Sequence, residues 1–428
     1  MFNKTSKKWL VVVTSLLLVT AVIFTACSSA TTVTTTTPQS TLTTTSPAVT
    51  TANTPIPTTS TSTAAPTSTA SPTTSTTIPT TSTPAITSTT TTSATTSTTP
   101  LPIVALNGAG GTFPAPLYTK MFAAYATLTG VQVNYQAVGS GAGITAITNN
   151  TVDFGASDAI MTSAQVSAAQ ASGNTLLTIP TTIGAVAIAY DLPELGTYQL
   201  KLTGTVLANI YLKNVKYWDD PSITALNPGA YLPHVPIAVV HRSDSSGTTY
   251  IFTNYLSAVS SQWASQVGNA TSVSWPGDIG GSGSAGVAAD VQQINGSIGY
   301  IELAYAIQNN IPYALMQNSS GNYVAPSLAS ASAAADGVTI PANTLIMITN
   351  SSNPNAYPIT GFTWLLVYQN QTNQAKGQEL VNLLWWMLNS GQQYCNPLTY
   401  PTLPASAVTV AEAEINSITY NGQALHHN

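Results

Sequence analysis

Arg242 is the only arginine among the 428 residues of this chain, and the side chains around it could also hold an anion. It lies in IAVVHRSDSSGTTYIFT, residues 237–253, which runs from an apolar segment into a Ser/Gly/Thr turn. A guanidinium is planar and always charged, and it can hold an oxyanion at two points, which the compact ammonium of lysine cannot do. Arg242 therefore predicts an oxyanion contact. The alternative is a surface arginine in a salt bridge with Asp244.

Three glycine-rich junctions in the chain share one design, in which a turn or strand leads into a helix. They lie in LNGAGGTFPAPLYTKMFAAY, in VQVNYQAVGSGAGITAI and in the stretch around Arg242. Each would direct free backbone N–H groups and a hydroxyl at one point, at the positive end of a helix dipole. If the three helix starts converge beside a guanidinium, they specify a small oxyanion with several acceptors. The turns hold Thr112 and Phe113 in the first junction, residues 139–143 in the second and residues 245–248 in the third.

Several familiar kinds of active site do not match these junctions, and a single glycine-rich turn is most often only a tight turn. No Gly-Lys-Ser/Thr follows any of them, and none has the G-x-G-x-x-G spacing with a suitable acidic residue beyond. HRSDSSGT lacks the G-x-S-x-G elbow of serine hydrolases. Four histidines, two of them at the C-terminus, offer little material for a metal cluster. We therefore expect no catalytic residue, no metal and no cofactor.

The composition argues against nucleic acid as a partner. Charged residues make up 5% of the chain, against roughly one quarter in typical soluble domains. Beyond the first 27 residues the lysines are five, and they are scattered singly. Binding to a phosphate backbone needs clustered lysine and arginine, so we expect no nucleic-acid binding.

The first 102 residues predict export and a spacer. Residues 1–27 have the order of a lipoprotein signal: lysines, the apolar run WLVVVTSLLLVTAVIFTA, then Cys27 as the lipidated residue. Phe24 departs from the usual leucine there, so an uncleaved membrane anchor is the alternative. Residues 28–102 are almost wholly Thr, Ser, Pro and Ala and carry no charge, which predicts a disordered stalk. Only Cys395 remains besides Cys27, so we expect no internal disulfide.

From residue 103 onward the chain predicts an α/β fold. VQVNYQA alternates as a strand does, GAVAIAY and IAVV are typical of short buried strands, and ELVNLLWWMLNS has helical spacing. Strands that alternate with helices form a sheet that binds ligands at the carboxyl ends of its strands. This length exceeds one typical domain, so two lobes are expected.

Six stretches, taken in order, resemble the phosphate-binding subunit of the Pst-type phosphate ABC transporter, over nearly all of residues 103 to about 410. The resemblance implies a type II periplasmic-binding-protein fold, in which two α/β lobes joined by a hinge close over one phosphate in the cleft between them. Lobe I would hold residues 103–184 and 355–428, and lobe II residues 185–354. The stretches are GAGGTFPAPLYTKMF, NYQAVGSGAGI, NNTVDFGASDA, YWDDPSITALNPG, VVHRSDSSGTTYIFTNYL and GSIGYIELAYA.

The resemblance also implies residue roles. Thr112, Ser140, Ser246 and Thr248 would donate hydroxyl or backbone hydrogen bonds, while Phe113 and Gly247 would offer backbone N–H groups. Arg242 would supply a bidentate cationic contact, and Asp244 would hold its guanidinium in place. Where the family often has a second arginine, this chain has His241, a departure that could change the field around the site. The residues with implied roles in binding are Thr112, Phe113, Ser140, Asp158, Arg242, Ser246, Gly247 and Thr248, with Asp244 in support.

Asp158 predicts which oxyanion is bound. A carboxylate repels an anion unless the anion brings a proton that the carboxylate can accept. Phosphate carries such a proton near neutral pH and sulfate does not, and leaving a buried polar group unpaired can discriminate by roughly 10⁴ to 10⁵. This reasoning favours phosphate over another tetrahedral oxyanion such as sulfate or molybdate.

The resemblance implies a membrane-tethered, extracytoplasmic monomer that delivers inorganic phosphate to permease and ATPase subunits without catalysis. Two other classes of protein stay open at the level of sequence. A surface phosphatase would need a nucleophile with a base, or a metal cluster, and the matched loops offer neither. A structural glycoprotein with a vestigial binding fold would have lost some of the matched side chains, yet all of them are present.

Overall fold

The computed structural model describes residues 104–277 and 279–428. The predicted signal at 1–27 with Cys27, and the predicted stalk at 28–102, lie outside the described residues. The described residues belong to one compact unit. Within the described ranges, no helix combines the length and the apolar character needed to cross a membrane.

One eight-stranded sheet organises the fold, in the order β2-β1-β3-β11-β4-β8-β6-β7. Its first three strands in that order are parallel, and so are its last three, while β11 runs antiparallel to both of its neighbours. The strand bounds are β1 Ala105–Gly110, β2 Gln132–Ala137, β3 Phe154–Ser157, β4 Leu176–Tyr190, β6 Ala238–Arg242, β7 Ile279–Gly281, β8 Ser297–Glu302 and β11 Thr360–Tyr368.

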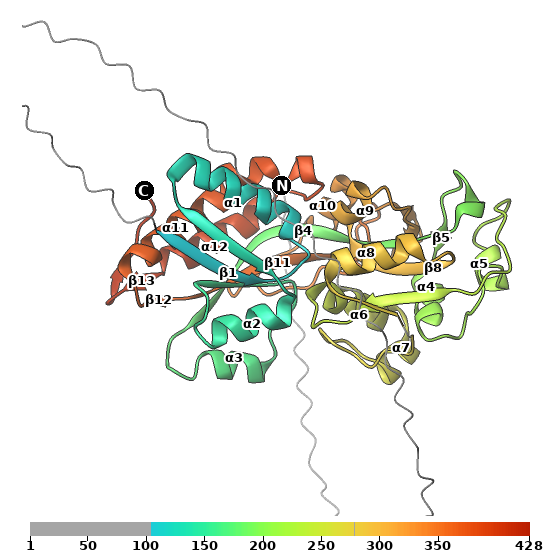
Figure 1. The fold of residues 1–428 in the computed structure, drawn as a ribbon, viewed down its shortest axis with the longest axis horizontal. Coiled ribbons are helices and arrows are strands. Elements are labelled where there is room, and N and C mark those ends of the chain that lie inside the picture. Colours follow the sequence, from blue (N-terminus) through green and yellow to red (C-terminus); the bar gives the residue numbers. More distant parts are fainter. Residues whose placement is uncertain (1–103, 278) are drawn as a thin grey trace, which may run out of the picture. The chain divides into compact units, whose positions relative to one another are not determined.

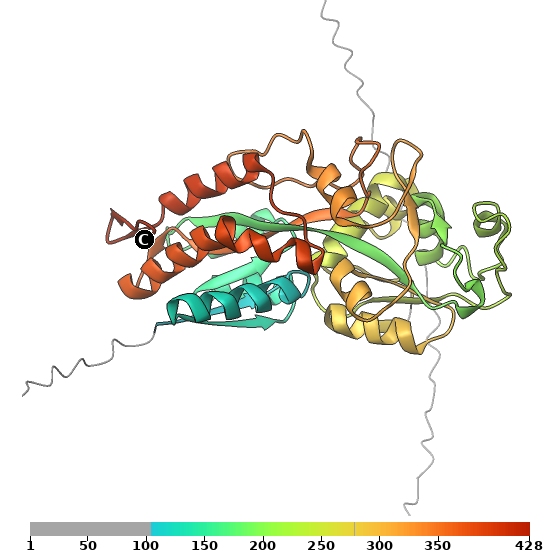
Figure 2. The same ribbon diagram turned by 90° about the horizontal axis from the view of Figure 1, so that it is seen from above.

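Strand β4 connects the two halves of this sheet, as the long strand in Figure 2 shows. Up to Ala185 it pairs with β11, and from Val186 it pairs with β8. The predicted change of lobe between residues 184 and 185 falls one residue before this change of partner. The predicted return at residue 355 falls shortly before β11. The lobe boundaries themselves stay a prediction.

The register along β4 makes the carboxyl ends of the two strand sets face each other. Ser157 at the end of β3 lies opposite Trp364, which in turn lies opposite Pro180 of β4. Glu302 at the end of β8 lies opposite Val186. Because β3 runs parallel to β4 and β8 runs antiparallel to it, both ends point into the segment of β4 between residues 180 and 186. Loops that leave these ends must therefore meet there.

Helices cover both faces of each half of the sheet. In Figure 1, α1, α11 and α12 lie on one side of the half that contains β1, and α2 and α3 lie on the other. Around β8, α8 and α9 lie opposite α6 and α7. The helix bounds are α1 Ala115–Thr129, α2 Ser140–Thr148, α3 Ser163–Ala169, α4 Gly204–Tyr211, α5 Pro221–Thr224, α6 Gly247–Val259, α7 Ser261–Gln266, α8 Gly283–Gln293, α9 Leu303–Gln308, α10 Leu328–Ala335, α11 Gln374–Leu388 and α12 Ala405–Asn416.

Smaller elements complete the fold. Two three-stranded sheets have the orders β10-β9-β5 and β12-β13-β14. Their bounds, with those of the three 3₁₀ turns, are β5 Lys201–Leu202, β9 Leu315–Gln317, β10 Tyr323–Val324, β12 Asn370–Gln371, β13 Thr419–Tyr420, β14 Gln423–Ala424, η1 Pro193–Leu195, η2 Ser390–Tyr394 and η3 Asn396–Leu398.

Two elements are longer than their apolar runs predicted. GAVAIAY is only the second half of β4, whose first half, LLTIPTTI, contains threonines and Pro180. The pairing with β11 shifts register between Thr363 and Trp364, beside Pro180, which has no N–H to donate. Helix α11 begins at Gln374, before the apolar run, because the Asn373 side chain accepts the Lys376 N–H as an N-cap. The only cysteine in the described part, Cys395, is free and buried.

Candidate anion site

Five loops at the carboxyl ends of parallel strands form one buried polar cluster, which we call the anion cluster. They follow β1, β2, β3, β6 and β7, and four of them lead directly into α1, α2, α6 and α8. The first N–H groups of a helix have no acceptor within it, so these helix starts offer donors to the cluster. The anion cluster consists of Thr112, Phe113, Ser140, Asp158, Arg242, Asp244, Ser246, Gly247, Thr248 and Ser284.

Gly247 shows how closely three of these loops approach. A Cβ atom at this position would lie 2.4 Å from Asp158 Oδ2 and 2.4 Å from Ser140 Oγ. The Asp158 N–H donates to Ser140 Oγ over 3.1 Å, which joins the loop after β3 to the start of α2. Ser246 is the N-cap of α6, and its Oγ accepts the Thr249 N–H. Residues more than 100 positions apart in the sequence therefore share one small volume.

The guanidinium of Arg242 is held by Asp244, and the residue is only 3% exposed. Its Nε donates to Asp244 Oδ1 over 2.7 Å and its Nη2 to Oδ2 over 2.5 Å. Nη1 donates to Thr248 Oγ1 at 3.2 Å and to Ser284 Oγ at 3.4 Å. The two-point contact made in the structure is thus with Asp244. Nη1 directs both of its hydrogens to hydroxyl groups, and the second Nη2 hydrogen has no acceptor among the described residues.

Asp244 remains an effective counterion because of these contacts. Burial by itself would raise its pKa, but the hydrogen bonds and charge of Arg242, with the Gly283 N–H, hold the pKa below its usual value. His241 lies apart from this pair. Its ring stacks on Trp275 at a centroid distance of 4.9 Å. The positive charge at the cluster is therefore that of Arg242.

Asp158 is a buried acid with two hydroxyl neighbours, and it is 1% exposed. Thr363 Oγ1 donates to its Oδ1 over 2.6 Å, and Ser140 Oγ lies 3.4 Å from its Oδ2. Burial raises the pKa of Asp158 to about 6, against the opposing effects of the Thr363 hydrogen bond, the Arg242 charge and the Ser140 hydrogen bond. At neutral pH it is therefore mostly an acceptor, and in mild acid it becomes a donor.

Three tyrosine hydroxyl groups donate hydrogen bonds to backbone carbonyls of the loop before α1. Tyr135 donates to the Gly111 carbonyl and Tyr305 to the Thr112 carbonyl, both over 2.7 Å. Tyr400 donates to the Phe113 carbonyl over 2.6 Å. These bonds use carbonyl groups of the loop, and the Gly111 N–H donates to the Ala156 carbonyl over 3.1 Å. The N–H groups of Thr112 and Phe113 and the Thr112 hydroxyl are therefore the donors that the loop can offer to the cluster.

Sequence reasoning missed Ser284 and Thr363. Ser284 N–H donates to Thr112 Oγ1 over 3.2 Å, so the loop after β7 closes onto the loop after β1. The signal for it was available in IGGSGSAGV, a fourth glycine-rich junction between a strand and a helix. Thr363 is a polar residue in the fully buried β11, and no local pattern indicated that it would face Asp158.

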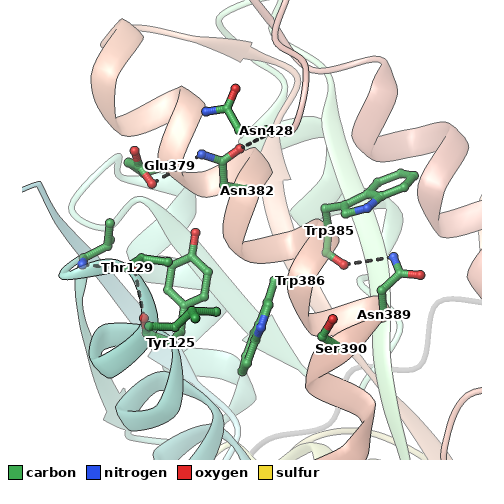
Figure 3. Close-up of a pocket in the computed structure, with 11 residues that line it drawn as sticks. Tyr125, Thr129, Glu379, Asn382, Trp385, Trp386, Asn389, Ser390 and Asn428 are labelled. Carbon is green, nitrogen blue, oxygen red and sulfur yellow. Dashed lines mark hydrogen bonds between the residues drawn. The ribbon is translucent and has the colours of Figure 1, made fainter.

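One cavity is lined in part by residues of the anion cluster, and another is lined by none of them. One, of about 320 Å³, opens beside Thr112 and Asp244, with Tyr305 at its wall. The other, of about 420 Å³, lies between α1 and α11 and is drawn in Figure 3. We call it the α1–α11 groove, and it is lined by Tyr125, Leu128, Thr129, Val131, Glu379, Asn382, Trp385, Trp386, Asn389, Ser390 and Asn428.

The chain matches proteins of known family over most of its length. A family model described as a PBP superfamily domain matches residues 29–388. A Xylella fastidiosa protein named phosphate-binding protein PstS is 41% identical over 312 residues, covering 72% of this chain and 84% of that protein. A Methanocaldococcus jannaschii protein of the same name is 35% identical over 337 residues, covering 74% and 86%. These names describe binding and not catalysis.

Solved structures agree on the fold. A periplasmic phosphate-binding protein bound with phosphate is 22% identical, has a TM-score of 0.59, and is matched over 72% of this chain and 93% of that one. A putative phosphate ABC transporter substrate-binding protein from Clostridium perfringens, also with bound phosphate, is 16% identical, with a TM-score of 0.50 over 70% and 100% of the two chains. The predicted fold class, an α/β periplasmic-binding-protein fold, is confirmed.

Proposed function

Because this chain belongs to the PstS family of phosphate-binding proteins, within the PBP superfamily, we propose that it binds inorganic phosphate and delivers it to an ABC permease. The observation that carries the proposal is the buried guanidinium of Arg242. Its Nη1 donates to Thr248 at the start of α6 and to Ser284 at the start of α8, and Ser284 is in turn hydrogen-bonded to Thr112, ahead of α1. A buried charge of this kind is costly unless it is paired, and Asp244 and a bound anion together would pair it.

The ligand would be held by many donors and one acceptor. The donors are the hydroxyl groups of Thr112, Ser140, Ser246 and Thr248, the backbone N–H groups of Phe113 and Gly247, and the Arg242 guanidinium. Donors fixed by the fold before the ligand arrives lose little further entropy on binding. Asp158 is the single acceptor, and it would receive a proton from the ligand.

Asp158 supports phosphate over sulfate for a physical reason. Near neutral pH its carboxylate is mostly ionised, since its pKa is about 6. A phosphate that still carries a proton donates it to this carboxylate, whereas sulfate has none and leaves two negative oxygens in contact. Another tetrahedral oxyanion is the second candidate for the ligand.

Delivery would follow from closure of two lobes. We place lobe I at residues 103–184 and 355–428 and lobe II at residues 185–354. Thr112 and Ser284 belong to different lobes in this division, and they are hydrogen-bonded in the structure. A ligand that bridges such a pair favours the closed form, and a permease that docks only the closed form would couple binding to transport.

We further propose that the protein works outside the cytoplasm as a monomer tethered to the outer face of the membrane. The residues that support this are the signal-like segment 1–27, lipidation at Cys27, and the Thr/Ser/Pro-rich segment 28–102 as a spacer. Mass spectrometry of the protein from its host would test the anchor. A diacylated N-terminal Cys27 is the expected product, and an unprocessed chain would contradict it.

Calorimetric titration of the full chain tests the central proposal. The protein is unfolded and refolded to remove carried-over ligand, then titrated separately with phosphate and with sulfate. We expect tight one-to-one phosphate binding with little response to sulfate. Stronger binding of sulfate or molybdate would favour the second candidate, and binding of none of the three would overturn the proposal.

A further inference from the structure

Glu302 is a fully buried acid at the point where the two halves of the sheet meet. It ends β8 and lies opposite Val186, where β4 changes partner from β11 to β8. It is 0% exposed. No role in anion binding follows from the sequence for this residue, and it is not part of the anion cluster.

The contacts of Glu302 lead to the loop before α1. Its Oε2 accepts the Ala304 N–H over 2.7 Å and lies 2.9 Å from the Tyr400 hydroxyl oxygen. That same hydroxyl lies 2.6 Å from the Phe113 carbonyl oxygen. The other carboxyl oxygen, Oε1, is buried and has no hydrogen-bond partner in the described part of the chain. Tyr400 thus connects Glu302 to the Phe113 carbonyl in the loop before α1.

The count of hydrogens in this chain of contacts indicates a neutral Glu302. A tyrosine hydroxyl has one hydrogen, and the shorter contact assigns it to the Phe113 carbonyl. The Tyr400 oxygen can then only accept from Glu302, which must carry a proton to donate. An ionised carboxylate would instead leave a buried charge with an unpaired oxygen, which is costly.

The surroundings agree with a neutral acid. Burial holds the pKa of Glu302 well above its usual range, against the opposing hydrogen bond from the Ala304 N–H, and the charge of Asp158 raises it further. The other ionisable groups that act on this cluster are Tyr305 and, through Tyr305, Arg242. Among these groups Arg242 is the only cation, and it is already paired with Asp244.

Packing links the same cluster to β4. A Cβ atom at Gly184 would lie 2.5 Å from the Phe113 ring and 3.5 Å from Glu302 Oε1. The rings of Phe113 and Tyr400 meet edge to face, with centroids 6.5 Å apart. Glu302 falls in the proposed lobe II, whereas Phe113 and Tyr400 fall in lobe I. The contact between Glu302 and Tyr400 is therefore made when the lobes are together.

We propose that Glu302 is a positioning residue for the anion site: as a neutral acid it donates to Tyr400, which in turn fixes the Phe113 carbonyl and so the backbone position of Phe113. The Phe113 N–H itself lies in the preceding peptide unit, whose Thr112 carbonyl is held by Tyr305. This inference rests on the proposed phosphate binding. It adds a consequence that can be measured: if Glu302 is ionised while the lobes are apart and its contact with Tyr400 forms only on closure, phosphate binding takes up a proton. The Glu302 carboxyl and the Tyr400 hydroxyl thus connect lobe closure to the geometry of the phosphate loop.

The test compares the wild type with Glu302→Gln, Glu302→Ala and Tyr400→Phe by calorimetry of the full chain. Glutamine is neutral and can donate to Tyr400 at any pH, but its NH₂ group cannot also accept the Ala304 N–H as Oε2 does, so Glu302→Gln should bind phosphate more weakly than the wild type and more tightly than Glu302→Ala. Tyr400→Phe and Glu302→Ala should each weaken binding by about tenfold, the size of one lost hydrogen bond to a buried group.

Proton uptake separates positioning from a merely structural role. Titrations at pH 8 in buffers of different ionisation enthalpy give the number of protons taken up per phosphate bound. The wild type should take up more protons than Glu302→Gln, because glutamine has no proton to gain. At pH 8 the free proteins both carry an ionised Asp158, whose pKa is about 6, and both receive the same ligand, so the difference reports Glu302.

The outcomes separate this inference from the function it rests on. If the wild type does not bind phosphate, the proposed function fails. If the wild type binds and Glu302→Gln takes up the same number of protons, the proton-linked role of Glu302 is overturned. Should Glu302→Ala fail to fold, Tyr400→Phe decides the positioning role, and affinity within twofold of the wild type would contradict it.

Discussion

The anion cluster and the α1–α11 groove are two regions of the same chain, and they differ in charge and in hydrogen-bond donors. The groove is the larger of the two cavities, at about 420 Å³ against about 320 Å³ beside the cluster. It is lined by aromatic rings, amides and Glu379, without lysine or arginine. Its Trp386 packs against Tyr125 with ring centroids 5.3 Å apart (Figure 3). The cluster instead has a buried guanidinium and several helix starts.

Cavity size therefore does not identify an anion site in this chain. An anion site is identified by buried hydrogen-bond donors and a buried positive charge that point into the same volume. The groove has acceptors and a carboxylate that would repel an anion, and the cluster has one acid whose pKa of about 6 lets it exchange a proton with its ligand. The substitutions below test whether phosphate affinity depends on the cluster alone.

Arg242→Ala should have the largest effect. Removing the guanidinium leaves Asp244 as a half-buried carboxylate without its partner and removes the only full positive charge from the cluster. We expect a loss of about 2 to 5 kcal/mol in phosphate binding, measured by calorimetry. Arg242→Lys is the matched control, because it keeps the charge but loses the two-point contact with Asp244, and it should fall in between. A loss below about 0.5 kcal/mol would contradict the assigned role.

Asp158→Asn should change selectivity more than affinity. An asparagine can donate to sulfate, so the preference for phosphate over sulfate should narrow by about a hundredfold, part of the discrimination that an unpaired buried group can give. Competition titrations of the two anions measure this ratio. Thr363→Val is a useful companion, since it removes a hydrogen bond to Asp158 Oδ1 and keeps the acid. An unchanged ratio in Asp158→Asn would rule out the proton-acceptor account.

Lowering the pH should narrow the preference of the wild type for phosphate over sulfate, as Asp158→Asn does. The folded-state pKa of Asp158 is raised to about 6, so below that pH the residue is mostly a neutral donor, and above it a carboxylate. Sulfate affinity should therefore rise as the pH falls through about 6, by at most about tenfold per pH unit for one coupled proton. Asp158→Asn should lack this dependence, and sulfate titrations from pH 5 to 8 measure it.

Gly247→Ala should close the cluster sterically. The added methyl would lie 2.4 Å from Asp158 Oδ2 and from Ser140 Oγ, so the loops must separate to accept it. We expect phosphate affinity to fall about tenfold, with a loss of about 1 to 3 kcal/mol in the free energy of unfolding, as for other overpacked sites. Isothermal titration and chemical denaturation measure the two effects. Affinity equal to that of the wild type would show that the ligand does not approach Gly247.

Trp386→Ala in the α1–α11 groove should have the smallest effect on phosphate affinity. The tryptophan packs against Tyr125 and Tyr394 but is partly exposed. Its loss should therefore reduce the free energy of unfolding by at most about 3 to 5 kcal/mol. Phosphate affinity should stay within about twofold of the wild type. A large loss of affinity in a folded Trp386→Ala protein would mean that the two regions are coupled.

Local sequence determined a large part of this protein. The glycine-rich junctions, the capping residues and the single arginine lie within stretches of about 20 residues, and each acts through its nearest neighbours in the chain. These features gave the starts of α1, α2 and α6 and the residues that the structure gathers around Arg242. They also carried the family resemblance, because the family motifs are themselves these junctions.

Tertiary structure decided what each of these residues contacts. Only the fold brought Thr363 to Asp158 and Ser284 to Thr112, across 205 and 172 positions of the chain. Only the register of β4 placed Glu302 where the two halves of the sheet meet, and only the packing of the segment after η3 brought Tyr400 to the Phe113 carbonyl. The physical reason is that helix starts and turns are fixed by hydrogen bonds between near neighbours, whereas side-chain contacts between distant strands depend on how the whole core packs.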